Sequence, residues 1–263
     1  MASTYVPNTA NFRLSDVVDV FPTADRLSQC FGQASDGYFY PSFKGVKDRL
    51  SNFRYYATKF GYLYNAFALT NLAAAGWRVP SHADYVTLIT YIGGPTGTAA
   101  SMRINNTIHW SALIGTNIYK FNAKAAGMRM YSSGYYLDTG NKTTAWYWTT
   151  DFLINSYMVL STATDISAHT PLNTDIPKRN GFTVRLVKNT TTLTNGQRGN
   201  YTGNDGKVYP TICIGTQEWL ADNLKETKFN TGAVITYINA ANWGVDNTPA
   251  RCAYWDYDND TMV

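Results

Sequence analysis

Charge is scarce in this sequence. Only 15% of its 263 residues are Asp, Glu, Lys or Arg, against about 25% in a typical globular protein. The net charge is +4, and the Lys and Arg residues are scattered. The densest basic stretch, residues 178–188, has spacing that one face of a strand explains. The sequence therefore lacks the basic runs of proteins that bind nucleic acid or anionic membranes, and we expect neither as a partner.

Long apolar runs are absent too. No stretch approaches the 18 consecutive apolar residues of a membrane-spanning helix. Residues 1–16, MASTYVPNTANFRLSD, lack the basic and then apolar order of a secretory signal peptide. We therefore expect no membrane insertion, and we expect an exit route other than secretion, such as assembly into a particle released by lysis.

Cysteine is rare, with three residues at Cys30, Cys213 and Cys252. An odd number with wide spacing is not a disulfide framework. We predict buried free thiols, because a free cysteine packs as a small hydrophobic residue. A bridge between Cys213 and Cys252 stays open as an alternative if their strands pair with suitable geometry.

The sequence also lacks the motifs of nucleophilic catalysis and phosphate binding, G-x-S-x-G, G-x-x-x-x-G-K-S/T and G-x-G-x-x-G. His82, His109 and His169 stand far apart, with no partner at metal-ligand spacing. Nothing places two of the 18 acidic residues at one cleft, although a pair for glycoside hydrolysis stays open. We predict a non-enzymatic protein without a cofactor.

One segment imitates a metal site. Asp256, Asp258 and Asp260 copy the first three ligands of a calcium loop. Thr261 occupies the position that needs glycine, and no bidentate glutamate follows. We therefore predict a structural turn and no metal site.

Aromatic residues are abundant, with 20 Tyr, 12 Phe and 7 Trp, and 44% of the chain is hydrophobic. That fraction supports a substantial core, in which most large aromatic side chains are expected to lie. The same composition suits surfaces that bind through tyrosine, which offers a large contact area at small entropic cost.

The most informative stretch is residues 203–224, GNDGKVYPTICIGTQEWLADNL, which predicts a turn, a strand, a second turn and a second strand. It resembles the opening of the Fibrobacter succinogenes major paralogous domain, with its series D-G-x-x-Y, I-G-x-Q-x-W and E/D-N-L. The matching residues are Asp205, Gly206, Tyr209, Ile214, Gly215, Gln217, Trp219, Asp222, Asn223 and Leu224.

Earlier segments resemble the middle and the end of the same family. Residues 60–95 carry the Y-G-x-L-Y-N and G-W-x-V-P-S motifs, and residues 124–132, 144–150 and 181–188 resemble its later signatures. Leu186 stands where the family's closing strand has cysteine, so any role of that cysteine is lost here. The opening motif thus follows the closing motif, as in a circularly permuted domain.

The resemblance implies a C-type-lectin-like α+β fold, with short twisted antiparallel sheets and one or two helices, that serves as a binding scaffold. It divides the chain into the main part of this domain (55–189), a linker (190–202) and the permuted opening part (203–263). Five residues of the motifs, Trp77, Trp146, Trp219, Gly215 and Asn223, are expected to be structural.

The remaining segment, residues 1–54, resembles the N-terminal segments of structural proteins of phages that infect Bacteroidetes. The matching residues are Phe12, Leu14, Ser15, Asp16, Val17, Pro41, Phe43, Gly45, Lys47, Leu50, Asn52, Phe53 and Arg54. A segment of this size holds only a small core, and we expect it to attach the protein to other virion proteins or to sister subunits in a homo-oligomer.

These inferences lead to specific expectations. Residues 82–92 should form a helix capped by Ser81, with Tyr85, Leu88, Ile89 and Ile92 facing the core. The three motif tryptophans should be mostly buried. Strands from residues 206–214 should share a core with residues 181–187, and Asp260 should lie near Phe60.

For function, the expectation is a phage virion surface protein that binds a glycan or protein of the bacterial envelope or of mucus. In lectin-like folds that diversify for binding, the variable face precedes the closing strand, here residues 149–180. The candidate ligand-binding residues there are Asp151, Asn155, Tyr157, Asp165 and His169. A purely structural virion component and a bacterial cell-surface adhesin are the alternatives.

Overall fold

A computed structural model describes residues 57–111, 115–131, 142–151, 178–238, 243 and 247–253, together with strand backbone at 31–33, 39–41, 136–137, 157–161 and 166–169. The chain divides into two compact units, Met1–Asn52 and Phe53–Val263. In the first, β1 (Phe31–Gln33) pairs antiparallel with β2 (Phe39–Pro41). The second unit contains all the other described elements.

Helix α4 (His82–Tyr91) confirms the predicted helix, and the sequence explains both of its ends. Ser81 and Asp84 form a reciprocal capping box, in which each side chain accepts a hydrogen bond from the other residue's backbone N–H. After the last turn, Gly93 and Gly94 adopt φ values of +110° and +96°, which glycine reaches without strain. The four residues expected to face the core, Tyr85, Leu88, Ile89 and Ile92, are all buried.

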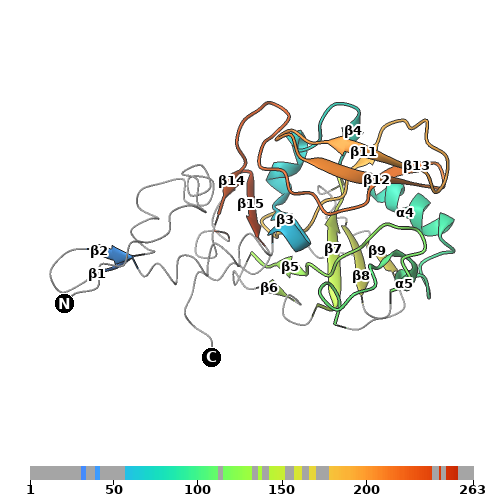
Figure 1. The fold of residues 1–263 in the computed structure, drawn as a ribbon, viewed down its shortest axis with the longest axis horizontal. Helices are drawn as coiled ribbons and strands as arrows, with labels where there is room; N and C mark the ends of the chain where they lie inside the picture. Colours follow the sequence, from blue (N-terminus) through green and yellow to red (C-terminus); the bar gives the residue numbers. More distant parts are fainter. Residues whose placement is uncertain are drawn as a thin grey trace, which may run out of the picture. The chain divides into compact units, whose positions relative to one another are not determined.

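The largest sheet has five strands in the order β11-β12-β13-β10-β4, and all neighbours are antiparallel. Three come from the C-terminal part of the chain: β11 (Arg198–Thr202), β12 (Val208–Ile214) and β13 (Gln217–Leu220). The others are β10 (Val187–Lys188) and β4 (Trp77–Arg78). Val187 pairs with Trp219 on one side and with Arg78 on the other. Figure 1 shows the orange C-terminal strands among the blue, green and yellow elements of the earlier segment.

A three-stranded sheet joins the same two parts of the chain. Its order is β14-β15-β3, with β14 (Thr236–Tyr237) parallel to β15 (Ala250–Ala253) and β15 antiparallel to β3 (Tyr62–Tyr64). A 3-10 helix, η2 (Ala66–Asn71), follows β3. The C-terminal segment therefore enters two sheets that residues 62–188 leave incomplete.

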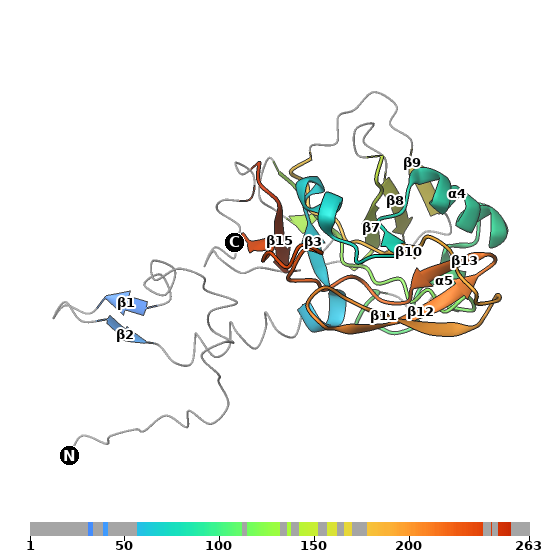
Figure 2. The ribbon, with the colours of Figure 1, turned by 90° about the horizontal axis from the view of Figure 1, so that it is seen from above.

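The third sheet, β7-β8-β9, is an antiparallel meander formed by one continuous region. Its strands are β7 (Thr144–Trp148), β8 (Tyr157–Ser161) and β9 (Ile166–His169). Helix α4 lies against β8 and β9 (Figure 2). Further elements are the short helix α5 (Ala99–Met102) and the antiparallel pair of β5 (Met128–Arg129) and β6 (Tyr136–Leu137).

The core consists of two clusters, and both mix early and late residues. One contains Phe182, Val184 and Leu186 beside Tyr209 and Leu220. The other contains the helix residues Tyr85 and Leu88, with Val187, Ile212, Ile214 and Trp219. The predicted shared core of residues 206–214 and 181–187 is therefore confirmed, within one chain. The other half of that prediction, the proximity of Asp260 to Phe60, lies outside the described residues.

The fold is α+β as predicted, with many short strands, few helices and mostly antiparallel pairing. In the described part of the chain, no helix has the length and apolar character needed to cross a membrane. The linker prediction was too long. Arg198–Thr202, assigned to the linker, forms β11, because it pairs residue by residue with Ile212–Val208 of β12.

The prediction that the three motif tryptophans are mostly buried is confirmed, although the degree of burial differs among them. Trp219 is fully buried and stacks on Tyr85 at a centroid distance of 5.1 Å. Trp77 and Trp146 are partly exposed, packed against the rim of the first core cluster. The fully buried tryptophan of strand β7 is Trp148, whose indole N–H donates to the carbonyl of Tyr64 at 2.7 Å.

Candidate functional site

Three of the five predicted ligand residues fall among the described positions, and the β7-β8-β9 sheet brings two of them together. Tyr157 and His169 are directly opposite each other in the β8–β9 register. Tyr157 is also opposite Trp148, the last residue of β7. Asp151 follows β7 by three residues at this end of the sheet. Asn155 and Asp165 lie outside the described residues.

Asp151 makes a contact that the sequence did not predict. Its carboxylate Oδ2 accepts a hydrogen bond from the backbone N–H of His82, the first residue of α4, at 2.5 Å. The neighbouring Thr150 N–H donates to the carbonyl of Pro80 at 2.7 Å. A negative charge at a helix N-terminus is stabilising. Asp151 therefore fastens the start of α4 to the end of β7.

The opposite end of α4 borders a depression of about 250 Å³ that joins the helix to the β12–β13 turn. It is lined by Thr87, Tyr91, Asn195, Ile214, Gly215, Thr216 and Gln217. The sequence motifs indicated only a structural role for Gly215 and gave no reason to consider Tyr91. The feature that singles out Tyr91 is an aromatic side chain on the polar face of α4, and this residue is 46% exposed.

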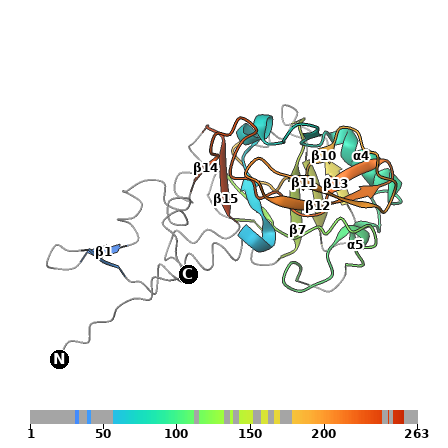
Figure 3. The same cartoon turned by 45° about the horizontal axis from the view of Figure 1, so that its top comes forward.

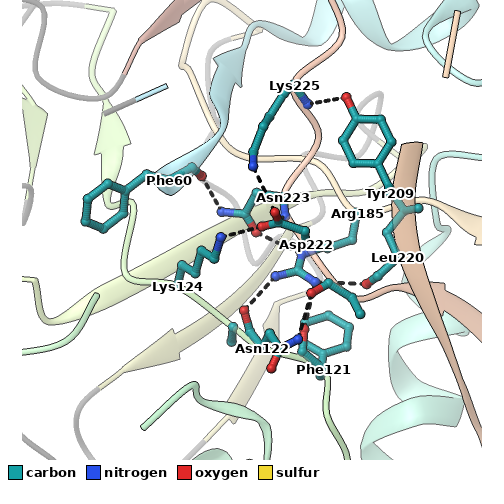
Figure 4. Close-up of polar contacts among 12 residues, drawn as sticks. Phe60, Phe121, Asn122, Lys124, Arg185, Tyr209, Leu220, Asp222, Asn223 and Lys225 are labelled. Carbon is teal, nitrogen blue, oxygen red and sulfur yellow. Dashed lines mark hydrogen bonds and ion pairs between the residues drawn. The ribbon is translucent and has the colours of Figure 1, made fainter. Parts of the chain in front are cut away.

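A buried polar cluster joins the C-terminal segment to the earlier segment (Figure 4). At its centre is Arg185, which has no exposed surface. Its guanidinium donates four hydrogen bonds of 2.7–2.9 Å, to the Asn223 side chain and to the carbonyls of Phe121, Asn122 and Leu220. The predicted structural residue Asn223 continues the cluster, because its amide group donates to the carbonyl of Phe60 at 2.7 Å.

A second layer of this cluster is ionic. The carboxylate of Asp222 binds Lys124 Nζ at 2.5 Å and Lys225 Nζ at 2.9 Å. Burial raises the pKa of Asp222, but the charges of Lys124, Lys225 and Arg185 outweigh it, and the net pKa lies below the usual value. Burial is the main cause that lowers the pKa of Lys124 to about 8.

The buried polar cluster around Arg185 is the seam between the C-terminal segment and the earlier segment. Glu226 and Asp205 form a pair of carboxylates beside this seam. Glu226 is fully buried, and its Oε2 accepts the Asp205 N–H at 3.1 Å. Burial and the nearby Asp205 charge raise the pKa of Glu226 to about 7. Asp205 is held by Thr227, whose backbone N–H and hydroxyl both donate to Oδ2 at 2.9 Å. A Cβ at position 203 would lie 1.7 Å from Glu226 Oε1, so a larger residue there would displace the Glu226 side chain.

The described residues contain no group of three or more His, Cys, Asp or Glu side chains placed to hold a metal ion. His109 is buried against Phe60, at a centroid distance of 4.9 Å, and burial is the main cause that lowers its pKa to about 3. Cys213 and Cys252 are buried free thiols, as predicted. The acidic residues between Asp256 and Asp260 lie outside the described residues.

The chain belongs to the Fibrobacter succinogenes major domain family, whose model matches residues 33–188. The match begins earlier than residue 55, where the motif comparison placed it, and ends with strand β10. No curated protein and no solved structure matches the chain.

Proposed function

We propose that this protein is a non-enzymatic surface component of a phage particle and that its second unit binds a glycan or protein of the bacterial envelope or of mucus. The observation that carries the binding role is the end of the β7-β8-β9 sheet beside α4. There Tyr157 and His169 lie opposite each other, on strands whose position is fixed by pairing and by the helix. Binding residues on a rigid scaffold are the usual arrangement in recognition domains.

We further propose that the second unit is a C-type-lectin-like domain in circularly permuted order. The family match ends at residue 188, and the stretch that resembles the family's opening comes after it. Two pairings support the permutation: β13 lies beside β10, and β15 lies beside β3. An opening segment placed at the end of the chain would have to make contacts of this kind.

Attachment is assigned to the N-terminal segment, residues 1–54. Its resemblance to phage structural proteins and the presence of a separate compact unit at Met1–Asn52 support a role in binding other virion proteins or sister subunits. Capsid and tail genes next to the gene of this protein would favour the virion assignment over a bacterial adhesin.

The test of binding is adsorption of the purified, fluorescently labelled full chain to a panel of Bacteroidetes strains and to a printed glycan array. We expect saturable binding to at least one, and an affinity at least tenfold lower after Tyr157→Ala combined with His169→Ala. The matched control is Asn200→Ala, an exposed position on β11. A chain that binds no strain and no glycan would instead support the purely structural role.

A further inference from the structure

The depression at the end of α4 exists only because two distant parts of the chain meet there. Thr87 and Tyr91 come from the helix, whereas Gly215 and Gln217 come from the β12–β13 turn, and Asn195 comes from the loop before β11. Figures 2 and 3 show α4 beside the orange strands that carry this turn.

Tyr91 is held in place while nearly half of its surface stays accessible. The ring covers Gly215 so closely that a Cβ at this glycine would lie 2.8 Å from ring atom Cδ2. Tyr119 packs edge-on against it at a centroid distance of 6.2 Å. Despite both contacts, Tyr91 is 46% exposed. A fixed, exposed aromatic face loses little entropy when a ligand covers it.

Polar groups border this ring on the side of the turn. Asn195 is exposed and oriented by the Gly215 N–H, which donates to its Oδ1 at 2.9 Å. The amide of Gln217 donates to Asp84, at 3.3 Å to the backbone carbonyl and 3.4 Å to Oδ1. Its Oε1 is buried without a hydrogen-bond partner among the described residues. Thr216 and Thr87 add two exposed hydroxyl groups.

We propose that this depression binds a single pyranose ring of a saccharide. A pyranose has one face of C–H groups, which suits the exposed ring of Tyr91, and an edge of hydroxyl groups, which suits the exposed polar groups of Asn195, Thr216 and Thr87. The volume of about 250 Å³ lies below the roughly 300–1,000 Å³ of sites for drug-sized ligands and fits one small ring better than a folded partner. The proposal rests on the binding function proposed above and adds a ligand class at a separate place, the other end of α4 from Asp151.

The test is an NMR titration of the ¹⁵N-labelled full chain with the methyl glycosides of glucose, galactose, mannose, N-acetylglucosamine and fucose. We expect at least one glycoside to bind weakly, with a dissociation constant of about 1 mM. Binding should change the chemical shifts of the backbone amide signals of Gly215, Thr216 and Gln217. Thr87→Arg should block the depression and abolish these shifts. Val86→Arg is the matched control, because Val86 is an exposed neighbour on α4 that does not line the depression.

Each outcome decides the proposal separately from the binding function. If no glycoside shifts these amides, or if Thr87→Arg titrates like the unmodified chain, the saccharide site is wrong, even where the chain still adsorbs to cells. If the glycosides bind here but no cell or glycan array retains the chain, the saccharide site stands and the proposed recognition function fails. Tyr91→Ala gives a second check, with an expected loss of at least tenfold in affinity.

Discussion

The seam around Arg185 and the outer surface of α4 differ in what their side chains are needed for. At the seam, Arg185 and Asn223 are completely buried, and their hydrogen bonds join residues far apart in the chain. On the outer surface of α4, Val86, Thr87 and Tyr91 are exposed. Buried polar groups must find partners or destabilise the fold, whereas exposed groups are free to contact a ligand. Substitutions at the seam should therefore change stability, and substitutions on α4 should change binding.

The largest effect is expected from Arg185→Met. This substitution leaves three backbone carbonyls and the Asn223 side-chain oxygen without their donor. Since each unsatisfied buried group costs about 1–3 kcal/mol, we expect the free energy of unfolding in urea to fall by about 4 kcal/mol or more. Arg179→Met is the control, with an expected loss below about 1 kcal/mol, because Arg179 is partly exposed and its Nε bonds to the Asn247 side chain at the surface. Equal losses in the two variants would mean that the seam is not the main polar support of the fold.

The second prediction separates the motif tryptophans. Trp219→Ala removes a fully buried ring that contacts Tyr85 and Phe121, and should lower the free energy of unfolding by about 3–5 kcal/mol. Trp146→Ala removes a partly exposed ring at the rim of the core, and we expect about half that loss. Chemical denaturation of both variants checks the difference, and a larger loss for Trp146 would contradict the described burial.

Local sequence signals predicted the elements well. Ser81 as a cap and the apolar positions at intervals of three and four predicted α4 to within one residue of its observed end. The turn at Gly215 and the apolar residues around it specify the hairpin of β12 and β13. These features depend on neighbours within a few positions of the chain.

Features that depend on the fold could not be predicted in this way. Arg185 donates to a carbonyl 64 residues earlier in the chain, and a lone arginine among apolar residues carries no sign of such a partner. Tyr91 lies over Gly215 because a helix and a hairpin meet in space. Asp151 was predicted as a ligand residue from its place in a polar loop, and its bond to the start of α4 appears only in three dimensions.

The third prediction concerns pH at the seam. Glu226 has a pKa of about 7 in the folded chain, against about 4.3 when unfolded. A raised pKa means that its contribution to stability is complete below about pH 4.3 and is lost as the pH rises through 7. Glu226→Gln mimics the protonated acid, so this variant should be more stable than the unmodified chain at pH 8, by on the order of 3 kcal/mol, and similar to it at pH 4.5.

The Glu226→Gln variant and the unmodified chain must be compared at each pH, because His109 changes the stability with pH in the opposite direction. Its pKa is lowered to about 3, so its contribution to stability is lost as the pH falls below about 6.5. This contribution is common to both chains and cancels in the difference. Thermal unfolding at pH 4.5, 6 and 8 measures that difference, and a difference that does not change with pH would rule out Glu226 as the titrating group.

The smallest effect is expected at Asp151, where a structural role and a binding role can be told apart at a single residue. Asp151→Ala removes the acceptor of the His82 N–H, and loss of such a cap typically costs about 1 kcal/mol. Asp151→Asn keeps an acceptor oxygen but removes the charge that favours the helix N-terminus, so it should lose about half as much. If capping is the role of this residue, adsorption to cells should stay within twofold of the unmodified chain in both variants, while the Tyr157→Ala and His169→Ala pair loses affinity. Urea denaturation and adsorption, measured on the same preparations, give both values. An Asp151→Ala variant that is stable but no longer adsorbs would identify Asp151 as a ligand-binding residue, as the sequence predicted. It would also show that the hydrogen bond from Asp151 to α4 contributes little to the stability of the fold.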